Sequence, residues 1–333
     1  MRYLIRSASL TGFAAVARSV GLDPASLLPS VGLEPSVLQD PDRRIPVDAV
    51  RTLLESSARA SGAEDFGLRM ALTRNLSNLG PLGLVVREEP TLRAMLDTLA
   101  RYVRLHNESR FFRVDQTGGV VVISQELFVG RPMPVRQSVE LSIGMLHRSL
   151  NALLGGQWHP LRVCFRHDAP AKLATHHRVF GGTPVQFDAD FDGVVCRASD
   201  LERPLPAADP VLARYGRQYL DSLAAPADAT PRDRVRQLVR LLLPSGRCTV
   251  EQVAQHLGVD RRTIHRQLAR NGCTFSGLVD DVREEIVSGV LASPRRPLSD
   301  VSELLGFSAQ SAFSRWFRAR FGCSATQWRE RVR

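Results

Sequence analysis

The 333-residue chain is poor in lysine and cysteine. Lys172 is its single lysine, so nearly all of its basic side chains are arginine. Its five cysteines stand far apart, and none belongs to a C-x-x-C pair. This usage predicts neither a disulfide framework nor a zinc site, and it favours a reducing, cytoplasmic location. We therefore expect no bound metal.

Long apolar runs are also missing. No stretch approaches the roughly 18 uninterrupted apolar residues of a membrane span, so we expect no membrane partner. The apolar segment from Leu10 to Ala17 lies between Arg6 and Arg18, which is the layout of a short signal peptide. An amphipathic helix ending near Gly21 is the favoured interpretation, because the apolar residues follow helical spacing: Phe13, Val16, Ala17 and Val20.

Familiar catalytic motifs are absent. The chain contains no G-x-S-x-G, P-loop, H-E-x-x-H or G-x-G-x-x-G pattern, so we expect no enzymatic activity and no cofactor. Several potential metal ligands occur in the middle of the chain, but their spacing fits no metal-binding template: Cys164, His167, His176, His177 and Cys196. His106 is expected to be structural, with a place beside a ligand pocket as the alternative.

The charge that is present is unevenly distributed. The net charge is +10, from 44 basic and 34 acidic residues. Residues 231–333 hold 18 arginines against 10 acidic residues, whereas residues 1–230 hold 26 basic and 24 acidic residues. A basic domain joined to a nearly neutral one is typical of a protein that binds a polyanion such as DNA.

The chain is predicted to contain two domains. An α+β domain over residues 1–223 is followed by a Pro/Ala-rich linker at 224–231 and an all-α domain over 232–333. In the first domain we expect helices at 48–60, 91–106, 135–154 and 209–223, with short helices after Asp23-Pro24 and Glu34-Pro35. Strands are expected at 110–115, 119–127, 161–165, 185–187 and 193–196, the first two joined as a hairpin.

The last hundred residues contain a helix-turn-helix pattern. Thr249 begins a capping box, and an apolar stripe follows at Val250, Val253, Ala254 and Leu257. Gly258 then makes a turn, and Asp260 is placed to cap a second helix at 261–270. This second helix should bury Ile264 and Leu268 and leave four polar residues facing outward: Arg261, Arg262, His265 and Arg266.

The same pattern recurs 48 residues later, with Gly306 at the turn position of Gly258. Ser299 is predicted to cap the first helix of this unit, and Ser308 to cap a helix at 309–321. Phe313, Trp316 and Phe317 resemble a nucleic-acid stacking platform, but their helical spacing favours the core. The other faces of the helix carry Gln310, Ser311, Ser314, Arg315 and Arg318.

A helix at about 276–292 is predicted between the two units, with Leu278, Val282, Ile286 and Val290 on one face. Seventeen residues span roughly 25 Å. Neighbouring major-groove faces of B-DNA are about 34 Å apart. With the half-widths of the flanking units, this bracing helix would let one chain place two recognition helices in adjacent grooves.

The C-terminal motifs resemble the signature of the AraC/XylS family of bacterial regulators. The matching residues are Gly306-Phe307-Ser308, Ser311 to Arg318, Phe321-Gly322 and Gln327-Trp328-Arg329. The resemblance implies double-stranded DNA as partner, with base-reading positions at Arg262, His265, Arg266, Gln310, Ser311, Ser314 and Arg315. Arg318 is expected to contact phosphate or solvent. Ala325 and Val301-Ser302 depart from the family pattern, which has proline and Ile-Ala there.

The first domain is similar to the "arabinose-binding-type" sensor domain of some AraC-type regulators. The similarity rests on Gly21 to Pro24, Arg44-Ile45-Pro46, Leu79 to Gly83 and Phe180-Gly181-Gly182. It implies an unknown small-molecule effector and a homodimer formed through this domain. The resemblance to the AraC/XylS family implies action as an activator rather than a repressor, with RNA polymerase as a partner. An enzyme carrying a helix-turn-helix appendage and an architectural DNA-binding protein without an effector are the alternatives.

Overall fold

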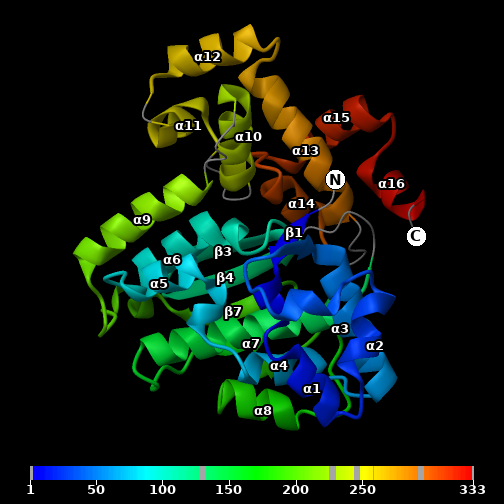
Figure 1. Cartoon of the computed structure of the whole chain (residues 1–333). Helices are drawn as coiled ribbons and strands as arrows, with labels where there is room; N and C mark the ends of the chain where they lie inside the picture. The colour runs from blue at the N-terminus through cyan, green and yellow to red at the C-terminus, as the bar shows by residue number, and fades with distance from the viewer. Residues whose placement is uncertain are drawn as a thin grey trace. The chain divides into compact units, whose positions relative to one another are not determined.

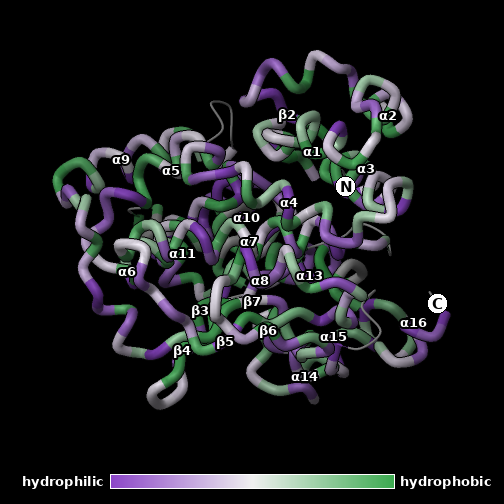
Figure 2. Tube along the Cα trace, turned by 90° about the horizontal axis from the view of Figure 1, so that it is seen from below, coloured by the Kyte–Doolittle hydropathy of each residue, from purple (hydrophilic) through white to green (hydrophobic). Residues whose placement is uncertain are grey.

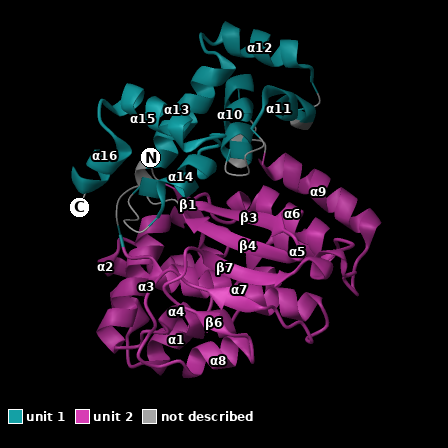
Figure 3. Cartoon of the chain, turned by 180° about the vertical axis from the view of Figure 1, so that it is seen from behind, with its two compact units in different colours: residues 1, 128–133, 225–333 teal, residues 2–127, 134–224 magenta. Residues whose placement is uncertain are grey.

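A computed structural model describes residues 3–127, 133–224, 230–243, 248–257, 259–291 and 296–331 (Figure 1). The chain forms two compact units (Figure 3). The N-terminal unit comprises residues 2–127 and 134–224, and the C-terminal unit is formed mainly by residues 225–333. Most of the predicted linker, at 225–229, lies outside the described residues.

The N-terminal unit is built around a five-stranded sheet in the order β3-β4-β7-β5-β6. The strands are β3 (Arg110–Thr117), β4 (Val120–Leu127), β5 (Arg162–Cys164), β6 (Val185–Gln186) and β7 (Asp192–Arg197). β5 and β6 pair in parallel, and the other neighbours pair antiparallel. The predicted strands and hairpin are confirmed, with Gly118 at the turn in the left-handed conformation that glycine tolerates best (φ 58°).

Helices cover this sheet and extend beyond it. They are α1 (Phe13–Ser19), α2 (Pro24–Ser30), α3 (Val47–Ser61), α4 (Phe66–Leu72), α5 (Pro81–Arg87), α6 (Leu92–Tyr102), α7 (Arg136–Leu153), α8 (Ala174–Phe180) and α9 (Pro210–Ala224). Short 3-10 helices occur at Ser7–Leu10, Pro35–Leu38, Leu76–Leu79, Val103–Leu105 and Ala198–Glu202. α7 is central, because it contacts α3, α4, α8 and β7.

Two apolar clusters hold the N-terminal unit together. One joins the sheet to α6 and α7 and includes Ile123, Ile143 and Phe165, each fully buried. The other lies among α1, α2, α3 and α4, with Phe13 and Phe66 at its centre. Green and purple segments alternate along these helices, as expected where one helix face packs inward (Figure 2). The α+β class is therefore confirmed.

The N-terminal apolar segment is an amphipathic helix, as favoured from the sequence: Phe13, Val16 and Ala17 of α1 are buried. The predicted helix at 91–106 is too long as a single α-helix. Beyond Tyr102 the chain tightens into a 3-10 turn, and the His106 carbonyl then accepts a hydrogen bond from the Arg6 amide. Tertiary pairing with β1 therefore overrides helical propensity at this end.

Other elements were not predicted. β1 (Leu4–Arg6) and β2 (Arg44–Pro46) form a separate two-stranded antiparallel sheet. α4, α5 and α8 have seven residues each, which is too short for a clear helical period.

The described part of the C-terminal unit is entirely helical. Its helices are α10 (Pro231–Leu242), α11 (Val250–Leu257), α12 (Arg261–Arg270), α13 (Phe275–Leu291), α14 (Leu298–Leu304), α15 (Gln310–Phe321) and α16 (Ala325–Arg331). Leu278, Val282, Ile286 and Val290 of α13 are all buried, as predicted for the bracing helix. None of the helices within the described ranges is both long and apolar enough to span a membrane.

The contact between α4 and α7 predicts a sensitive position. A Cβ on Gly67 would lie 2.1 Å from the carbonyl oxygen of Gln137, so Gly67→Ala must push the two helices apart. We expect a loss of about 1–3 kcal/mol in unfolding free energy, measured by urea denaturation. Gly182→Ala is the matched control, because nothing lies within 4 Å of its added Cβ. Equal stability of the two variants would contradict the close packing of α4 on α7.

Candidate DNA-binding site

The first helix-turn-helix unit consists of α11 and α12. The Thr249 hydroxyl accepts a hydrogen bond from the Gln252 amide at 3.2 Å, so the predicted cap of α11 is present. Val253 and Ala254 are buried, whereas Val250 and Leu257 are only partly buried. Gly258, the predicted turn residue, lies outside the described residues.

α12 begins at Arg261 and is capped by Asp260, as the sequence predicts. The Asp260 carboxylate accepts a hydrogen bond from the Thr263 amide at 2.6 Å. This backbone hydrogen bond is the main reason why the pKa of Asp260 lies below its usual value. Ile264 and Leu268 are fully buried, so the helix presents its opposite face outward. The four predicted outer residues are all exposed: Arg261, Arg262, His265 and Arg266.

The second unit consists of α14 and α15, and Gly306 makes the turn between them. Its backbone is left-handed (φ 67°), and a Cβ there would approach Leu243, at the end of α10 in the C-terminal unit, at 3.1 Å. Phe307 donates its amide to the Ser302 carbonyl at 3.0 Å, which closes the turn.

Two predicted caps in this unit are wrong. α14 begins at Leu298 after Pro297, and the Ser299 hydroxyl bonds the Asp300 carboxylate rather than a backbone amide. α15 begins at Gln310, one residue later than predicted, because Ala309 is extended (φ −152°) and occupies the cap position. Ser308 therefore lies before the helix start and does not cap it.

The aromatic residues of α15 form its core face. Phe313 and Phe317 are fully buried, which confirms a packing role for both. Trp316 is only partly buried, contrary to the prediction, and its ring packs 5.5 Å from that of Phe307. The opposite side of the helix is exposed and carries the predicted polar residues: Gln310, Ser311, Ser314, Arg315 and Arg318.

The arginines of α12, α13 and α15 fall into two groups. Arg283 and Arg320 are engaged in ion pairs with carboxylates, and Arg261 pairs with Glu251 at 3.1 Å. In contrast, five of the predicted site residues make no hydrogen bond or ion pair through their side chains with any described part of the chain: Arg262, His265, Arg266, Arg315 and Arg318. These exposed donors on α12 and α15 are therefore available to a ligand outside the chain.

α13 fixes the second unit through Arg283, a residue that sequence analysis did not single out. Its guanidinium lies 3.8 Å from the centre of the Phe307 ring. It donates hydrogen bonds to the carbonyls of Leu305 at 2.9 Å and Gly306 at 3.3 Å. The turn that starts α15 is thus bonded directly to the bracing helix.

Two of the candidate histidines of the N-terminal unit lie beside a carboxylate. His167 and His176 place their Nε2 atoms 3.3 and 3.4 Å from Oε1 of the buried Glu140. Cys164 and Cys196 are buried, and burial raises the pKa of Cys196 to about 12. Within the described ranges, no three His, Cys, Asp or Glu side chains are arranged to hold a metal ion.

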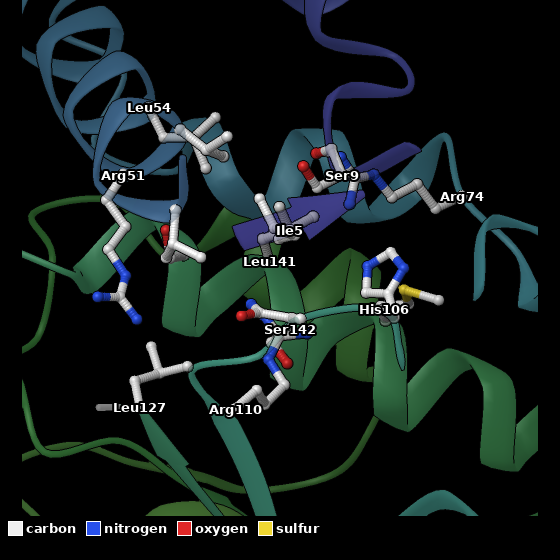
Figure 4. A pocket seen from close by; sticks show the side chains of 15 residues that line it. Ile5, Ser9, Arg51, Leu54, Arg74, His106, Arg110, Leu127, Leu141 and Ser142 are labelled. Carbon is white, nitrogen blue, oxygen red and sulfur yellow. The ribbon is translucent and has the colours of Figure 1, made fainter. Parts of the chain in front are cut away.

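The N-terminal unit also contains a small cavity of about 30 Å³ among β1, α3, α7 and the start of β3 (Figure 4). His106, the residue considered for a ligand pocket, lines it and is 4% exposed. Sequence analysis missed the three arginines that line the same space: Arg51, Arg74 and Arg110. No short motif links these residues, because the fold brings them together from three separate segments.

Two helix-turn-helix units joined by a bracing helix define a DNA-binding regulator. Residues 21–205 match the family model of the arabinose-binding domain found at the N-terminus of AraC transcription regulators. Residues 253–331 match that of a helix-turn-helix domain. The chain therefore belongs to the AraC family of transcription regulators, and it is not an enzyme.

Relatives match along nearly the whole chain. The HTH-type transcriptional regulator VirS of Mycobacterium tuberculosis is 32% identical, over 98% of this chain and 96% of its own length. The ornithine utilization regulator of Pseudomonas aeruginosa is 26% identical, over 93% and 91%. The crystal structure of the regulator CdpR from Pseudomonas aeruginosa is 19% identical, with a TM-score of 0.48, over 97% of this chain and 96% of that one.

The second turn yields a prediction. Gly306→Ala should destabilise the C-terminal unit by more than Gly322→Ala, because both glycines are left-handed but only Gly306 has Leu243 close to its added Cβ. The left-handed conformation costs each alanine about 1–2 kcal/mol. Thermal unfolding of the full chain measures both variants. A loss at Gly306 no larger than that at Gly322 would contradict the tight approach of Leu243 to the turn.

Proposed function

We propose that the chain is a ligand-responsive activator that reads DNA with α12 and α15 in adjacent major grooves. The observation that carries this proposal is the row of exposed side-chain donors, without partners in the described chain, on the outer faces of both helices. Arginine paired with guanine is the commonest specific contact in the major groove. Unpaired exposed arginines are suited to this role because no internal ion pair has to be broken first.

The proposed contacts differ between the two helices. α12 would use Arg262, His265 and Arg266 on base edges, with Arg261 near phosphate after exchange of its exposed ion pair with Glu251. α15 would use Gln310, Ser311, Ser314 and Arg315 on bases and Arg318 on phosphate. The 17-residue α13 spans roughly 25 Å between them, which together with the helix half-widths suits a groove spacing of about 34 Å.

The N-terminal unit is proposed to bind the effector and to control when the reader binds. Ligand binding can shift the chain between DNA-competent and DNA-incompetent arrangements only if the two differ in affinity for the ligand. The cavity beside His106 supports an effector over a purely architectural role. We propose that residues 224–231 connect the two domains and that RNA polymerase is the partner in activation. We also propose a cytoplasmic location, because the protein needs access to DNA.

Arg315 gives the sharpest test of DNA reading. Arg315→Ala should weaken binding to a site selected from a random duplex library by about 1–3 kcal/mol and relax the preference at one base position. Mobility-shift titrations against the selected site and a scrambled duplex measure both effects. Arg18→Ala, an exposed arginine of the N-terminal unit, controls for the change in net charge.

The outcomes distinguish a base contact of Arg315, a phosphate contact and no contact with DNA. Weaker binding to the selected site alone supports a base contact. Equal weakening on both duplexes would make Arg315 a phosphate contact and overturn the proposed base reading. No change on either duplex would contradict the placement of α15 in the groove.

We propose that a second copy of the chain pairs with the N-terminal unit through α9. Four apolar residues at four-residue spacing form an exposed stripe on this helix: Val211 at 61%, Tyr215 at 56%, Tyr219 at 54% and Leu223 at 45%. The other face packs inward through Ala213, Leu220 and Gly216, so the stripe is not core. A straight apolar stripe is self-complementary across a two-fold axis, as a symmetric dimer requires.

Dimerisation through this stripe predicts that a charged residue at position 219 weakens the dimer. Tyr219→Glu should weaken the dimer by about tenfold or more, because the interface would bury an unpaired charge. Sedimentation velocity of the full chain measures the dissociation constant. Leu38→Glu, at another exposed apolar residue, is the control. A monomeric wild-type chain at micromolar concentration, or a dimer unaffected by Tyr219→Glu, would contradict pairing through α9.

A further inference from the structure

The cavity beside His106 is lined by positively charged side chains. Three arginines line it: Arg51 of α3, Arg74 just after α4, and Arg110 at the start of β3. Figure 4 shows them on different sides of the pocket, with Ser9 beside Arg74 and the aliphatic Ile5 and Leu141 in the middle of the view. The lining contains no aspartate or glutamate. The cavity wall therefore carries several positive charges and no negative charge.

The arginines differ in how they are held. Arg51 is 2% exposed, donates to the Ser109 hydroxyl at 2.9 Å and lies 3.6 Å from the Asp48 carboxylate. Arg74 is 6% exposed and donates to the backbone carbonyls of Ser9 and Thr11. Arg74 and Arg110 have no ion-pair partner among the described residues, and the guanidinium of Arg110 has no hydrogen-bond partner there either. At least two of the three charges are therefore uncompensated.

All three guanidiniums stay protonated at neutral pH. Burial lowers the pKa of Arg51 and Arg110 to about 10 and that of Arg74 to about 9, and the mutual repulsion of Arg74 and Arg110 contributes to the last value. Burial, followed by the charge of Arg110, lowers the pKa of His106 well below its usual value. His106 is therefore a neutral ring that can donate or accept a hydrogen bond.

Buried polar atoms at the cavity also lack partners. His106 Nδ1, Ser9 Oγ and Arg110 Nε are enclosed without a hydrogen bond in the described chain. His106 and Ser9 are 4% and 3% exposed, so bulk water does not satisfy them. Buried polar groups are normally paired, and an unpaired group marks a place where a water molecule or ligand belongs. A cavity of about 30 Å³ holds one or two waters, and water does not neutralise the charge.

We infer that this cavity is the head-group site of an anionic effector and that the effector is a small aliphatic carboxylic acid. A carboxylate accepts paired hydrogen bonds from guanidinium and would neutralise the charge that the chain itself leaves uncompensated. The rest of the lining is largely aliphatic and suits a short hydrocarbon chain: Ile5, Val47, Val50, Leu54, Leu141 and Met145. The inference rests on the proposal that the N-terminal unit binds an effector.

The small volume of the cavity limits the length of the acid that can bind. The enclosed space admits a carboxylate group but not a long chain, so a larger acid must displace side chains of α3 or α7 as it enters. Because α7 contacts α3, α4, α8 and β7, such a displacement would be felt across the N-terminal unit. Affinity should rise from acetate to butyrate, because each added methylene contacts the aliphatic lining, and fall again when the side-chain displacement needed by a longer acid outweighs that gain.

Thermal unfolding of the full chain tests the ligand class without DNA. The probes are sodium acetate, butyrate and hexanoate at millimolar concentration, against chloride at equal ionic strength. Butyramide is the neutral analogue, and inorganic phosphate is an anion without a hydrocarbon chain. We expect butyrate to raise Tm by a few degrees, because a ligand that binds only the folded state stabilises it. Butyramide and chloride should leave Tm unchanged.

Arg110→Met distinguishes binding from a structural role. Replacing an uncompensated buried charge by an apolar side chain should leave the ligand-free protein at least as stable as the wild type. It should also weaken the response to butyrate by about tenfold or more. Arg93→Met, at an exposed arginine paired with Glu202 outside the cavity, is the matched control and should keep the full response. Leu141→Phe, which fills the cavity without changing its charge, should also abolish the response.

Each outcome decides one claim. A ligand-free Arg110→Met protein that is strongly destabilised, or one that keeps the butyrate response, would overturn the anion site. Equal stabilisation by butyramide would leave an effector site but remove the requirement for an anion, so the proposed function would survive. Stabilisation by phosphate alone would overturn the carboxylic acid. Butyrate binding that leaves DNA affinity unchanged would support the site and contradict its role in regulation.

Discussion

The C-terminal unit depends on the contact between Arg283 of the bracing helix and the turn that starts α15. One guanidinium stacks on Phe307 and holds the carbonyls of Leu305 and Gly306, so α13 and the second turn are joined through a single side chain. Arg320 adds a second attachment by pairing with Glu284 and Asp281 of α13. The direction of α15 is therefore set by α13 and not only by its own short partner, α14.

Arginine serves three separate purposes in a chain that has almost no lysine. Arg283 and Arg320 hold helices together, Arg262 and Arg315 are left unpaired on exposed faces, and Arg110 brings charge into a cavity. The guanidinium suits all three because it stays charged when partly buried and offers donors in a fixed plane. What distinguishes the three purposes is the surroundings: carboxylates in the first case, solvent in the second and a buried cavity lined by no carboxylate in the third.

Sequence analysis predicted the parts that depend on local pattern. The hairpin of β3 and β4, the cap at Asp260 and the buried face of α13 all follow from residues close together in the chain. It failed at two helix starts and where segments far apart in the chain meet. Ser299 and Ser308 have the right side chains for caps, but Pro297 and Ala309 occupy those positions. The cavity arginines come from segments up to 59 residues apart, between Arg51 and Arg110, so no local signal joins them.

The central claim is that one chain reads two successive major grooves. Methylation interference at guanine N7 on a selected site tests it most directly, because the methyl group blocks contacts in the major groove alone. For each bound chain, we predict two patches of interference about 10 base pairs apart on one side of the duplex. A single patch per chain, or two patches on opposite sides of the duplex, would contradict it, since α12 and α15 could not then both lie in the groove.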